Sequence, residues 1–238
     1  MEKNKLVTMG AILGVSLVLA ALIIAGTFLN IRKLDDSLSV SGSAKQAVTA
    51  DAARWTGNFT RVAEASRLKE GYAQMKADEK AVNAFLSARG LSGKFEISPV
   101  FMYEIYKNDQ NAPKEYTLTQ NLEVKSDDVQ AMKELAKSVE KLVEQGIIFS
   151  ASPVEYYYNQ LPAVRISLLP EAIKDAAARA EAIAASSGQR VGTVKSVSMG
   201  VVQVMPVGAI EISDYGSYDT SSIEKEVMVT VKATFGLK

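Results

Sequence analysis

A run of oxygen-bearing side chains lies near the C-terminus, in the segment EISDYGSYDTSSIE that ends at Glu224. Its candidate ligands, with one aromatic neighbour, are Asp214, Tyr215, Ser217, Asp219, Thr220 and Ser221. Calcium takes about six to eight oxygens from such side chains and from backbone carbonyls, but the spacing here is not that of an EF-hand. A turn-rich loop uses Asp, Gly and Ser equally well for its backbone geometry. We favour the turn and predict no metal, and we keep Asp214, Tyr215, Asp219 and Thr220 as a candidate ligand or interface loop.

Three consecutive tyrosines, Tyr156, Tyr157 and Tyr158, form a second group of interest. Tyr is common at protein interfaces because it is large, mostly apolar and able to hydrogen-bond. Side chains alternate between the two faces of a strand, so at least one of the three should face a core and at least one should not. The pattern leaves core packing and a subunit contact equally open.

The residue types most often used in catalysis are scarce. The chain has no Cys and no His, which excludes thiolate nucleophiles, Cys/His zinc sites and the commonest general base near neutral pH. Asp175 and Arg179 stand four residues apart on a predicted helix, which is the spacing of an ordinary surface ion pair. No two acidic residues have the spacing of a recognisable catalytic pair. We therefore predict that the protein is not an enzyme and has no cofactor.

The charge balance argues against nucleic acid as a partner. Lys plus Arg equals Asp plus Glu, at 27 each, so the formal net charge is zero. Proteins that bind DNA or RNA normally carry a basic excess or a basic stripe. The charged fraction of 23% and the apolar fraction of 47% are ordinary for a globular protein. We predict no nucleic-acid partner.

The N-terminal segment has the composition of a membrane anchor. An uncharged run begins at Leu6 and ends at Ile31, and a helix of this length exceeds a hydrocarbon core of about 30 Å. The run is much longer than the apolar region of a signal peptide, about 7–15 residues, and no convincing Ala-x-Ala cleavage site follows it. Two lysines before the run balance Arg32 and Lys33 after it, so the positive-inside rule gives a tie.

The free amino terminus and the short tail break this tie and favour a cytoplasmic N-terminus. We expect residues 1–5 to be a cytoplasmic tail, 6–31 the span, 32–37 a short linker and 38–238 the folded body. The predicted location is the inner (cytoplasmic) membrane, as a single-pass protein whose main body lies on the periplasmic side. The lipid bilayer is then one predicted partner.

The first half of the body has the pattern of a strand, a helix and a hairpin. Residues 38–59 alternate as one long strand, and residues 65–89 keep near-helical apolar spacing up to Gly90. Residues 95–105 form a strand that contains Pro99, so we expect a sheet edge or a bulge there. Residues 115–125 alternate apolar and polar side chains, which predicts an antiparallel partner strand with one wet face.

The second half repeats this order. A linking helix is predicted at residues 127–145, with Asp127 as a candidate N-cap, and a strand at 147–158. An alanine-rich helix that starts near Pro170 and two strands, 191–206 and 224–235, follow. The predicted fold class is α+β: an N-terminal transmembrane helix, then two strand–helix–hairpin repeats, at about 38–125 and 147–238, in mainly antiparallel sheets.

Four segments resemble the bacterial SIMPL-domain family, once described as a domain of unknown function. They are LSVSGSAKQAVTADAARW, with Gly42 and Asp51 at the family's recurrent positions, SPVEYYYNQL, EAIKDAAARAEAIA and SDYGSYDTSSIEKEV. The resemblance covers residues 38–238. It implies a periplasmic or envelope-facing α+β protein that forms homo-oligomers and has loose links to stress tolerance, and it implies no catalytic residue. The apparent uncleaved anchor departs from relatives that are exported with a cleaved signal.

Two functional hypotheses follow. The first is a non-enzymatic, membrane-anchored envelope protein that assembles with itself as a scaffold, cage or ring. The second is a membrane-anchored sensor that binds a small ligand or a metal, with residues 206–223 and the alanine-rich helix beside a pocket. A hydrolase that uses carboxylates is the least favoured reading.

Overall fold

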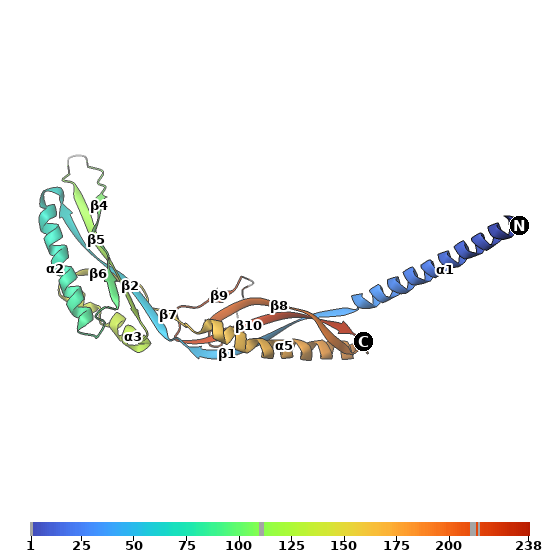
Figure 1. Ribbon diagram of the computed structural model, residues 1–238. Helices are drawn as coiled ribbons and strands as arrows, with labels where there is room; N and C mark the ends of the chain where they lie inside the picture. The colour runs from blue at the N-terminus through green and yellow to red at the C-terminus, as the bar shows by residue number, and fades with distance from the viewer. Residues whose placement is uncertain (1, 110–111, 210–212, 214) are drawn as a thin grey trace. The chain divides into compact units, whose positions relative to one another are not determined.

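The computed structural model describes the backbone of residues 2–109, 112–209, 213 and 215–238, and their side chains except for 2–8, 11 and 28–35. The contacts within the chain divide it into two compact units. Unit 1 comprises Met1–Ala44, Leu168–Val201 and Val229–Lys238, and unit 2 comprises Lys45–Ser167 and Val202–Met228. Helices and mainly antiparallel sheets make up the chain (Figure 1), which confirms the predicted α+β class.

Unit 1 takes its residues from one long N-terminal helix, one covering helix and three long strands. These elements are α1 Glu2–Asp35, β1 Ser37–Thr49, α5 Leu161–Ser186, β8 Val191–Pro206 and β10 Glu224–Leu237. The sheet has the strand order β1-β10-β8-β9, in which β9 is the short strand Ser217–Tyr218. Strands β8 and β10 are antiparallel, because Gly192 lies beside Gly236 while Thr230 Oγ1 donates to Val201 O at 3.2 Å.

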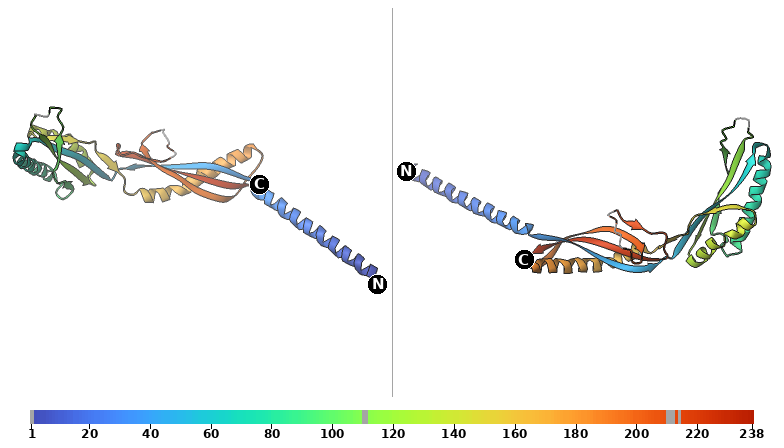
Figure 2. Two further views of the ribbon diagram at one scale, coloured as in Figure 1. Left: turned by 90° about the horizontal axis from the view of Figure 1, so that it is seen from above. Right: turned by 180° about the vertical axis from the view of Figure 1, so that it is seen from behind.

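Helix α5 lies along this sheet in both views of Figure 2, and it packs there through small side chains. Ala172, Ala176 and Ala180 are fully buried in the core of unit 1. A Cβ atom at Gly42 of β1 would collide with the α5 backbone at Ala172 and Ala176, so the glycine permits the close approach. Small side chains on α5 and a glycine on β1 therefore bring the helix close to the sheet.

The start of α5 corrects a prediction. The helix begins at Leu161, and Pro170 lies inside it instead of in its first turn. Val164 and Leu168 are buried and continue the stripe of Ala172 at four-residue spacing. Burial of this stripe outweighs the helical hydrogen bond that Pro170 removes.

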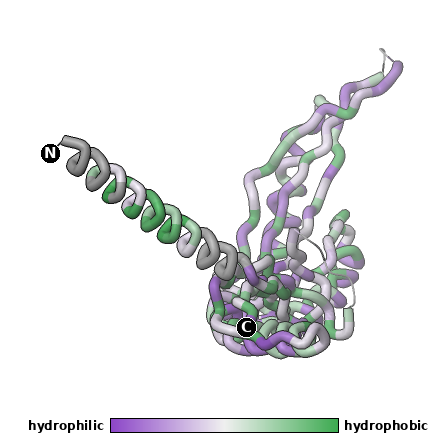
Figure 3. The backbone as a smooth tube through the Cα atoms, turned by 90° about the vertical axis from the view of Figure 1, so that its right-hand side faces the viewer, coloured by the Kyte–Doolittle hydropathy of each residue, from purple (hydrophilic) through white to green (hydrophobic). Residues whose placement is uncertain are grey.

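Helix α1 is continuous from Glu2 to Asp35. Its described side chains, residues 9–10 and 12–27, are all exposed, and Figure 3 shows that this described stretch is mostly apolar. Among the helices in the part of the chain that the structure describes, none has the length and hydrophobicity needed to cross a membrane.

Unit 2 is built on a six-stranded sheet whose main strand order is β3-β5-β2-β6. The strands are β2 Ala52–Glu64, β3 Phe95–Ile97, β4 Phe101–Ile105, β5 Glu115–Ser126, β6 Ile148–Ala151 and β7 Glu155–Tyr157. Strands β3 and β4 both pair antiparallel with β5, and β6 and β7 both pair antiparallel with β2. The hairpin predicted between residues 95–105 and 115–125 is therefore confirmed.

Helices cover one face of the unit 2 sheet. They are α2 Leu68–Ser87, preceded by a 3-10 turn at Ala65–Arg67, α3 Val129–Lys137 and α4 Glu140–Glu144. Trp55 and Phe59 of β2 and Leu118 of β5 are buried against them. Asp78 of α2 is buried and forms an ion pair with Arg61 of β2, with an Nε–Oδ2 distance of 2.6 Å. This pair fixes the helix over the sheet.

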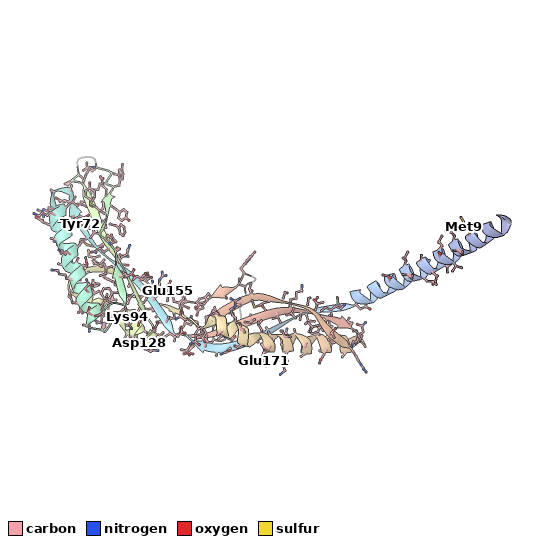
Figure 4. All side chains as sticks on the ribbon, in the orientation of Figure 1. Met9, Tyr72, Lys94, Asp128, Glu155 and Glu171 are labelled. Carbon is pink, nitrogen blue, oxygen red and sulfur yellow. The ribbon has the colours of Figure 1, made fainter. Side chains whose placement is uncertain are left out.

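Besides the strand predicted at 95–105, which is divided into β3 and β4, three predicted elements are divided in the structure. The long strand predicted at 38–59 breaks at Ala50 and Asp51, whose N–H groups donate to Ile223 O and Tyr157 O, so β1 and β2 enter different sheets. The linking helix is two helices, α3 and α4, and its N-cap is Asp128 instead of Asp127 (Figure 4), since Asp128 accepts from the Ala131 N–H. The strand predicted at 147–158 is interrupted between β6 and β7.

Candidate functional site

Asp219, one of the predicted ligand residues, is held by donors from its own loop. Its carboxylate accepts hydrogen bonds from the backbone N–H of Ser221 (2.9 Å) and of Ser222 (3.1 Å), and from both serine hydroxyls. The ammonium of Lys225 donates to the backbone oxygen of Asp219 at 2.5 Å and lies 3.3 Å from its carboxylate. These donors occupy the oxygens that a cation would need.

The electrostatics of this cluster show how tightly it is paired. Burial alone would raise the pKa of Asp219, but the hydrogen bonds from Ser221 and Ser222 and the charge of Lys225 hold that pKa well below its usual range. Lys225 is fully buried. Burial lowers its pKa, and the attraction of Asp219 opposes that shift. The cluster therefore joins the loop to the buried start of β10.

Two further described residues of the loop are held by backbone hydrogen bonds. Gln203 of β8 is buried, and its side chain donates to Ser213 O at 3.0 Å and accepts from the Ser213 N–H at 3.3 Å. Thr220 O accepts from the Tyr156 N–H at 2.8 Å. Tyr215, in contrast, is 98% exposed, and Asp214 lies outside the described residues. Among the described residues, no group of three or more acidic side chains is arranged to hold a metal ion.

The three tyrosines have three different surroundings. Tyr156 is buried in the core of unit 2, where burial raises its pKa. The Tyr157 hydroxyl donates to Glu155 at 2.8 Å, and its ring stacks on Tyr218 with 6.0 Å between centroids. The Tyr158 N–H donates to the Tyr218 hydroxyl at 2.9 Å. The alternation rule placed Tyr156 and its neighbours on opposite faces, but it gave no sign that Tyr218, sixty residues away, contacts them.

Asp51, which the resemblance singled out, has a structural contact at the turn between β1 and β2. Its carboxylate accepts from the Asn159 N–H at 2.8 Å, while its own N–H donates to Tyr157 O at 3.0 Å. The residue therefore ties this turn to the end of the tyrosine segment on both sides. These two hydrogen bonds help to hold unit 2 together, and the carboxylate has a structural role in one of them.

A polar cleft lies on the sheet face of unit 2 that is turned away from α2, here called the open face. The side chains that β2 and β5 contribute to the open face are Arg54, Thr56, Asn58, Thr60, Val62, Thr117, Thr119, Asn121 and Glu123. The cleft has a volume of about 650 Å³. Arg54 lies in it between Glu123 (3.3 Å) and Glu155 (3.4 Å), and Glu155 is marked in Figure 4. The wet face predicted for β5 is confirmed, but the cleft was missed because it depends on pairing with β2 and β3.

Four large apolar side chains lie on the open face beyond the cleft. In one row across the sheet, Phe101 of β4 lies opposite Thr119, Thr119 lies opposite Thr60, and Thr60 lies opposite Ile148 of β6. In the next row, Tyr103 lies opposite Thr117, which lies opposite Val62. Their exposed fractions are 42% for Phe101, 59% for Ile148, 62% for Tyr103 and 54% for Val62. Here these four residues are called the apolar rows.

A bulge at Pro99 puts the two aromatic rings on this face. Ile97 pairs with Leu122 and Phe101 with Thr119, so β3 and β4 contain one more residue than β5 over the same stretch. One extra residue moves the following side chains to the opposite face. Phe95 and Ile97 therefore pack on the core while Phe101 and Tyr103 are exposed. The bulge confirms the prediction made from Pro99, and the expectation of one long strand was wrong.

Comparison with known proteins gives one family. A family model named SIMPL, described as a protein of unknown function, matches residues 38–235. A search of curated proteins found no match.

Proposed function

The chain belongs to the SIMPL family, and we propose that it is a non-enzymatic, membrane-anchored envelope protein that assembles with itself. The observation that carries the self-assembly is the pair of apolar rows on the open face of unit 2. Threonines separate Phe101 from Ile148 and Tyr103 from Val62, so the neighbouring apolar side chains are the two aromatic residues of β4. Exposed apolar side chains with a polar surround are typical of interaction surfaces. Aromatic residues are also enriched at such surfaces.

The anchor in this proposal is the uncharged run from Leu6 to Ile31. Its support is the complete run in the sequence and the continuity of helix α1, because the side chains at both ends of the run lie outside the described residues. We place the folded body on the periplasmic side of the inner membrane and connect the assembly with envelope stress tolerance. Extraction of membranes at high pH tests the anchor: the full chain should stay in the membrane fraction, and a chain that lacks residues 1–31 should not.

The two strand–helix–hairpin repeats are the architecture that we propose for the body. In the first half, β2, α2 and the β4–β5 hairpin follow this order, and in the second half α5 is followed by β8 and β10. The halves, residues 38–125 and 147–238, are related by element order alone. The halves exchange strands, since β1 lies in the sheet of β8 and β10 while β6 and β7 pair with β2. Each sheet has one helix-covered face, and this leaves surfaces free for association.

Light scattering on the full chain in mild detergent tests self-assembly. We expect one species larger than a monomer. Phe101→Thr combined with Tyr103→Thr should weaken it at least tenfold, since each buried aromatic side chain at an interface contributes about 1–2 kcal/mol. The matched control is Tyr72→Gln, which removes an exposed aromatic side chain from α2 on the other side of the sheet. A monomer at high protein concentration contradicts the proposal, and so does an equal effect of the control.

A binding module remains the second candidate, and the polar cleft favours it. The cleft beside Arg54 is lined mainly by amide, hydroxyl and carboxylate groups, which suit a polar small molecule. This position differs from the pocket expected beside residues 206–223. A thermal-shift screen with polar metabolites, repeated on Asn121→Ala, separates the two functions: stabilisation that is lost in the variant supports binding.

A further inference from the structure

Strand β8 carries an unusually exposed segment in unit 1. Residues 193–201, with the sequence TVKSVSMGV, are nine consecutive exposed positions within the strand. In most strands that border a covered sheet one face is buried, so that exposure alternates. Here both faces are open over the whole segment. We call residues 193–201 the β8 segment.

The outer edge of the β8 segment is also open. In the strand order β1-β10-β8-β9, only the two residues of β9 lie on that side, and they pair with Gln203 and Val204. Within the described part of the chain, no strand lies beside residues 193–201 on this edge. The backbone groups along such an edge are a ready template for another strand.

The opposite edge of the same sheet is capped at one position. On β1, the Ser43 N–H donates to the Asp175 carboxylate of α5 at 2.8 Å, while the close approach of Gly42 to the α5 backbone lies on the covered face of the sheet. That hydrogen bond, followed by the one from Arg179, lowers the pKa of Asp175. Asp175 thus caps the edge of β1, which is more than the surface ion pair that its spacing predicted. A side chain of α5 thus caps one position of the β1 edge, whereas no strand of the described chain lies beside the β8 segment on its outer side.

The composition of the β8 segment favours strand pairing. Thr193, Val194, Val197 and Val201 are β-branched, and the segment has no Pro. Lys195 is the only charged residue between Val191 and Pro206. A single lysine is one of the devices that protect edge strands, but its ammonium is directed back to Asp36 O at 3.3 Å. The segment is therefore suited to pairing along its whole length.

We propose that the β8 segment pairs antiparallel with the β8 segment of a second copy, about a twofold axis at Val197. The inference deepens the proposed self-assembly, on which it rests, by naming one interface. An antiparallel pair centred on Val197 places Lys195 opposite Met199, and Thr193 opposite Val201. Each residue of the segment then lies opposite a different residue except Val197, as a twofold axis through an antiparallel pair requires.

The second copy suits this edge better than an unrelated strand for a geometric reason. The pairing is isologous, so one twofold axis satisfies both bare edges and leaves none open. Nine residues give a paired length of about 30 Å, which the identical segment of the partner matches in full.

Disulfide formation in single-cysteine variants tests the register, because the chain has no cysteine of its own. Val197→Cys in the full chain, oxidised in mild detergent, should form a covalent dimer, since residues directly opposite on antiparallel strands have Cβ atoms about 4.5–5.5 Å apart. Val194→Cys should not, because its two copies lie roughly 20 Å apart in this register. Thr193→Cys and Val201→Cys should cross-link only when the two variants are mixed. Thermal unfolding of each reduced variant checks that it folds.

A charge variant tests the strength of the interface. Val197→Lys places two like charges at the axis and should weaken dimerisation at least tenfold, while Val197→Thr should change it less than threefold. If light scattering shows an oligomer but Val197→Cys cross-links no better than Val194→Cys, the β8 interface is wrong and the proposed self-assembly stands. A monomer by light scattering overturns both the interface and the self-assembly.

Two further outcomes would change the proposal. A covalent dimer formed by Thr193→Cys without the second variant indicates parallel pairing and overturns the register. A β8 segment occupied by a different polypeptide overturns the choice of partner.

Discussion

Replacement of Asp219 by Ala should be far more destabilising than replacement of its partner Lys225 by Met. Lys225 is fully buried and Asp219 has a side chain that is 12% exposed. Asp219→Ala leaves a buried ammonium whose only remaining partner in this cluster is a backbone oxygen, 2.5 Å away. Loss of one member of a buried ion pair typically costs about 3–5 kcal/mol, and the remaining bond places this case near 3 kcal/mol. Lys225→Met removes the charge, retains the volume and leaves Asp219 with its serine donors, so we expect less than about 1 kcal/mol.

Urea unfolding at pH 7, followed by Trp55 fluorescence, measures both changes. Trp55 is the only tryptophan and is buried in unit 2, to which Asp219 and Lys225 also belong. A loss of 3 kcal/mol corresponds to a fall in the midpoint of roughly 1.5 M for a slope of about 2 kcal/mol per M. If Lys225→Met is as destabilising as Asp219→Ala, the ammonium stabilises the fold directly and our reasoning is refuted.

The same cluster predicts how stability depends on pH. The folded state lowers the pKa of Asp219, so the unfolded chain binds a proton more readily. The stabilisation is therefore complete above the unfolded pKa of about 3.9 and is lost as pH falls below it towards the folded value. Asp219→Asn should flatten the loss of stability between about pH 4 and pH 2. An unchanged acid profile in this variant would show that other carboxylates dominate acid unfolding.

Three further substitutions test packing and capping, each measured as the free energy of unfolding by calorimetry. Gly42→Val should lose about 1–3 kcal/mol because the side chain would overlap α5, whereas Ala in place of the exposed Gly10 should be nearly neutral. Asp78→Ala should lose about 3 kcal/mol because it leaves Arg61 unpaired, and Asp78→Asn should lose less. Asp175→Ala should lower the free energy of unfolding by about 1–2 kcal/mol, because it leaves the Ser43 N–H of β1 without its acceptor. Arg179→Ala should lower it by less than about 0.5 kcal/mol. Equal losses would favour the simple ion-pair interpretation.

Local patterns in the sequence predicted the elements that depend on local order. The alternation of residues 115–125 identified β5 and its wet face, and Pro99 identified the bulge, because period and missing N–H groups are properties of the chain itself. Val227, Val229 and Val231 alternate along β10, and all three are buried. The same alternation puts Lys225 on that face. The alternation alone therefore predicts that this lysine is buried, whereas its charge favours an exposed position.

The remaining errors come from contacts between distant parts of the chain. Nothing local marks the break at Ala50 and Asp51, because their N–H groups are satisfied by Ile223 and Tyr157, far along the sequence. The stacking of Tyr218 on Tyr157 likewise joins residues that are far apart in the sequence. The open-face cleft needs the pairing of three strands. Local sequence patterns cannot predict such arrangements, because they are determined by packing between segments that are distant in the sequence.

The buried polar groups of the described chain are almost all committed to holding the fold, and this bears on function. Asp78 pairs with Arg61, Lys225 with Asp219, and Gln203 with the Ser213 backbone. Among buried side-chain nitrogen and oxygen atoms in the described residues, only Gln120 Oε1 lacks a hydrogen-bond partner. The open face and the edge of the β8 segment lie outside these buried contacts, and exposed apolar groups and unpaired strand edges are features that suit association.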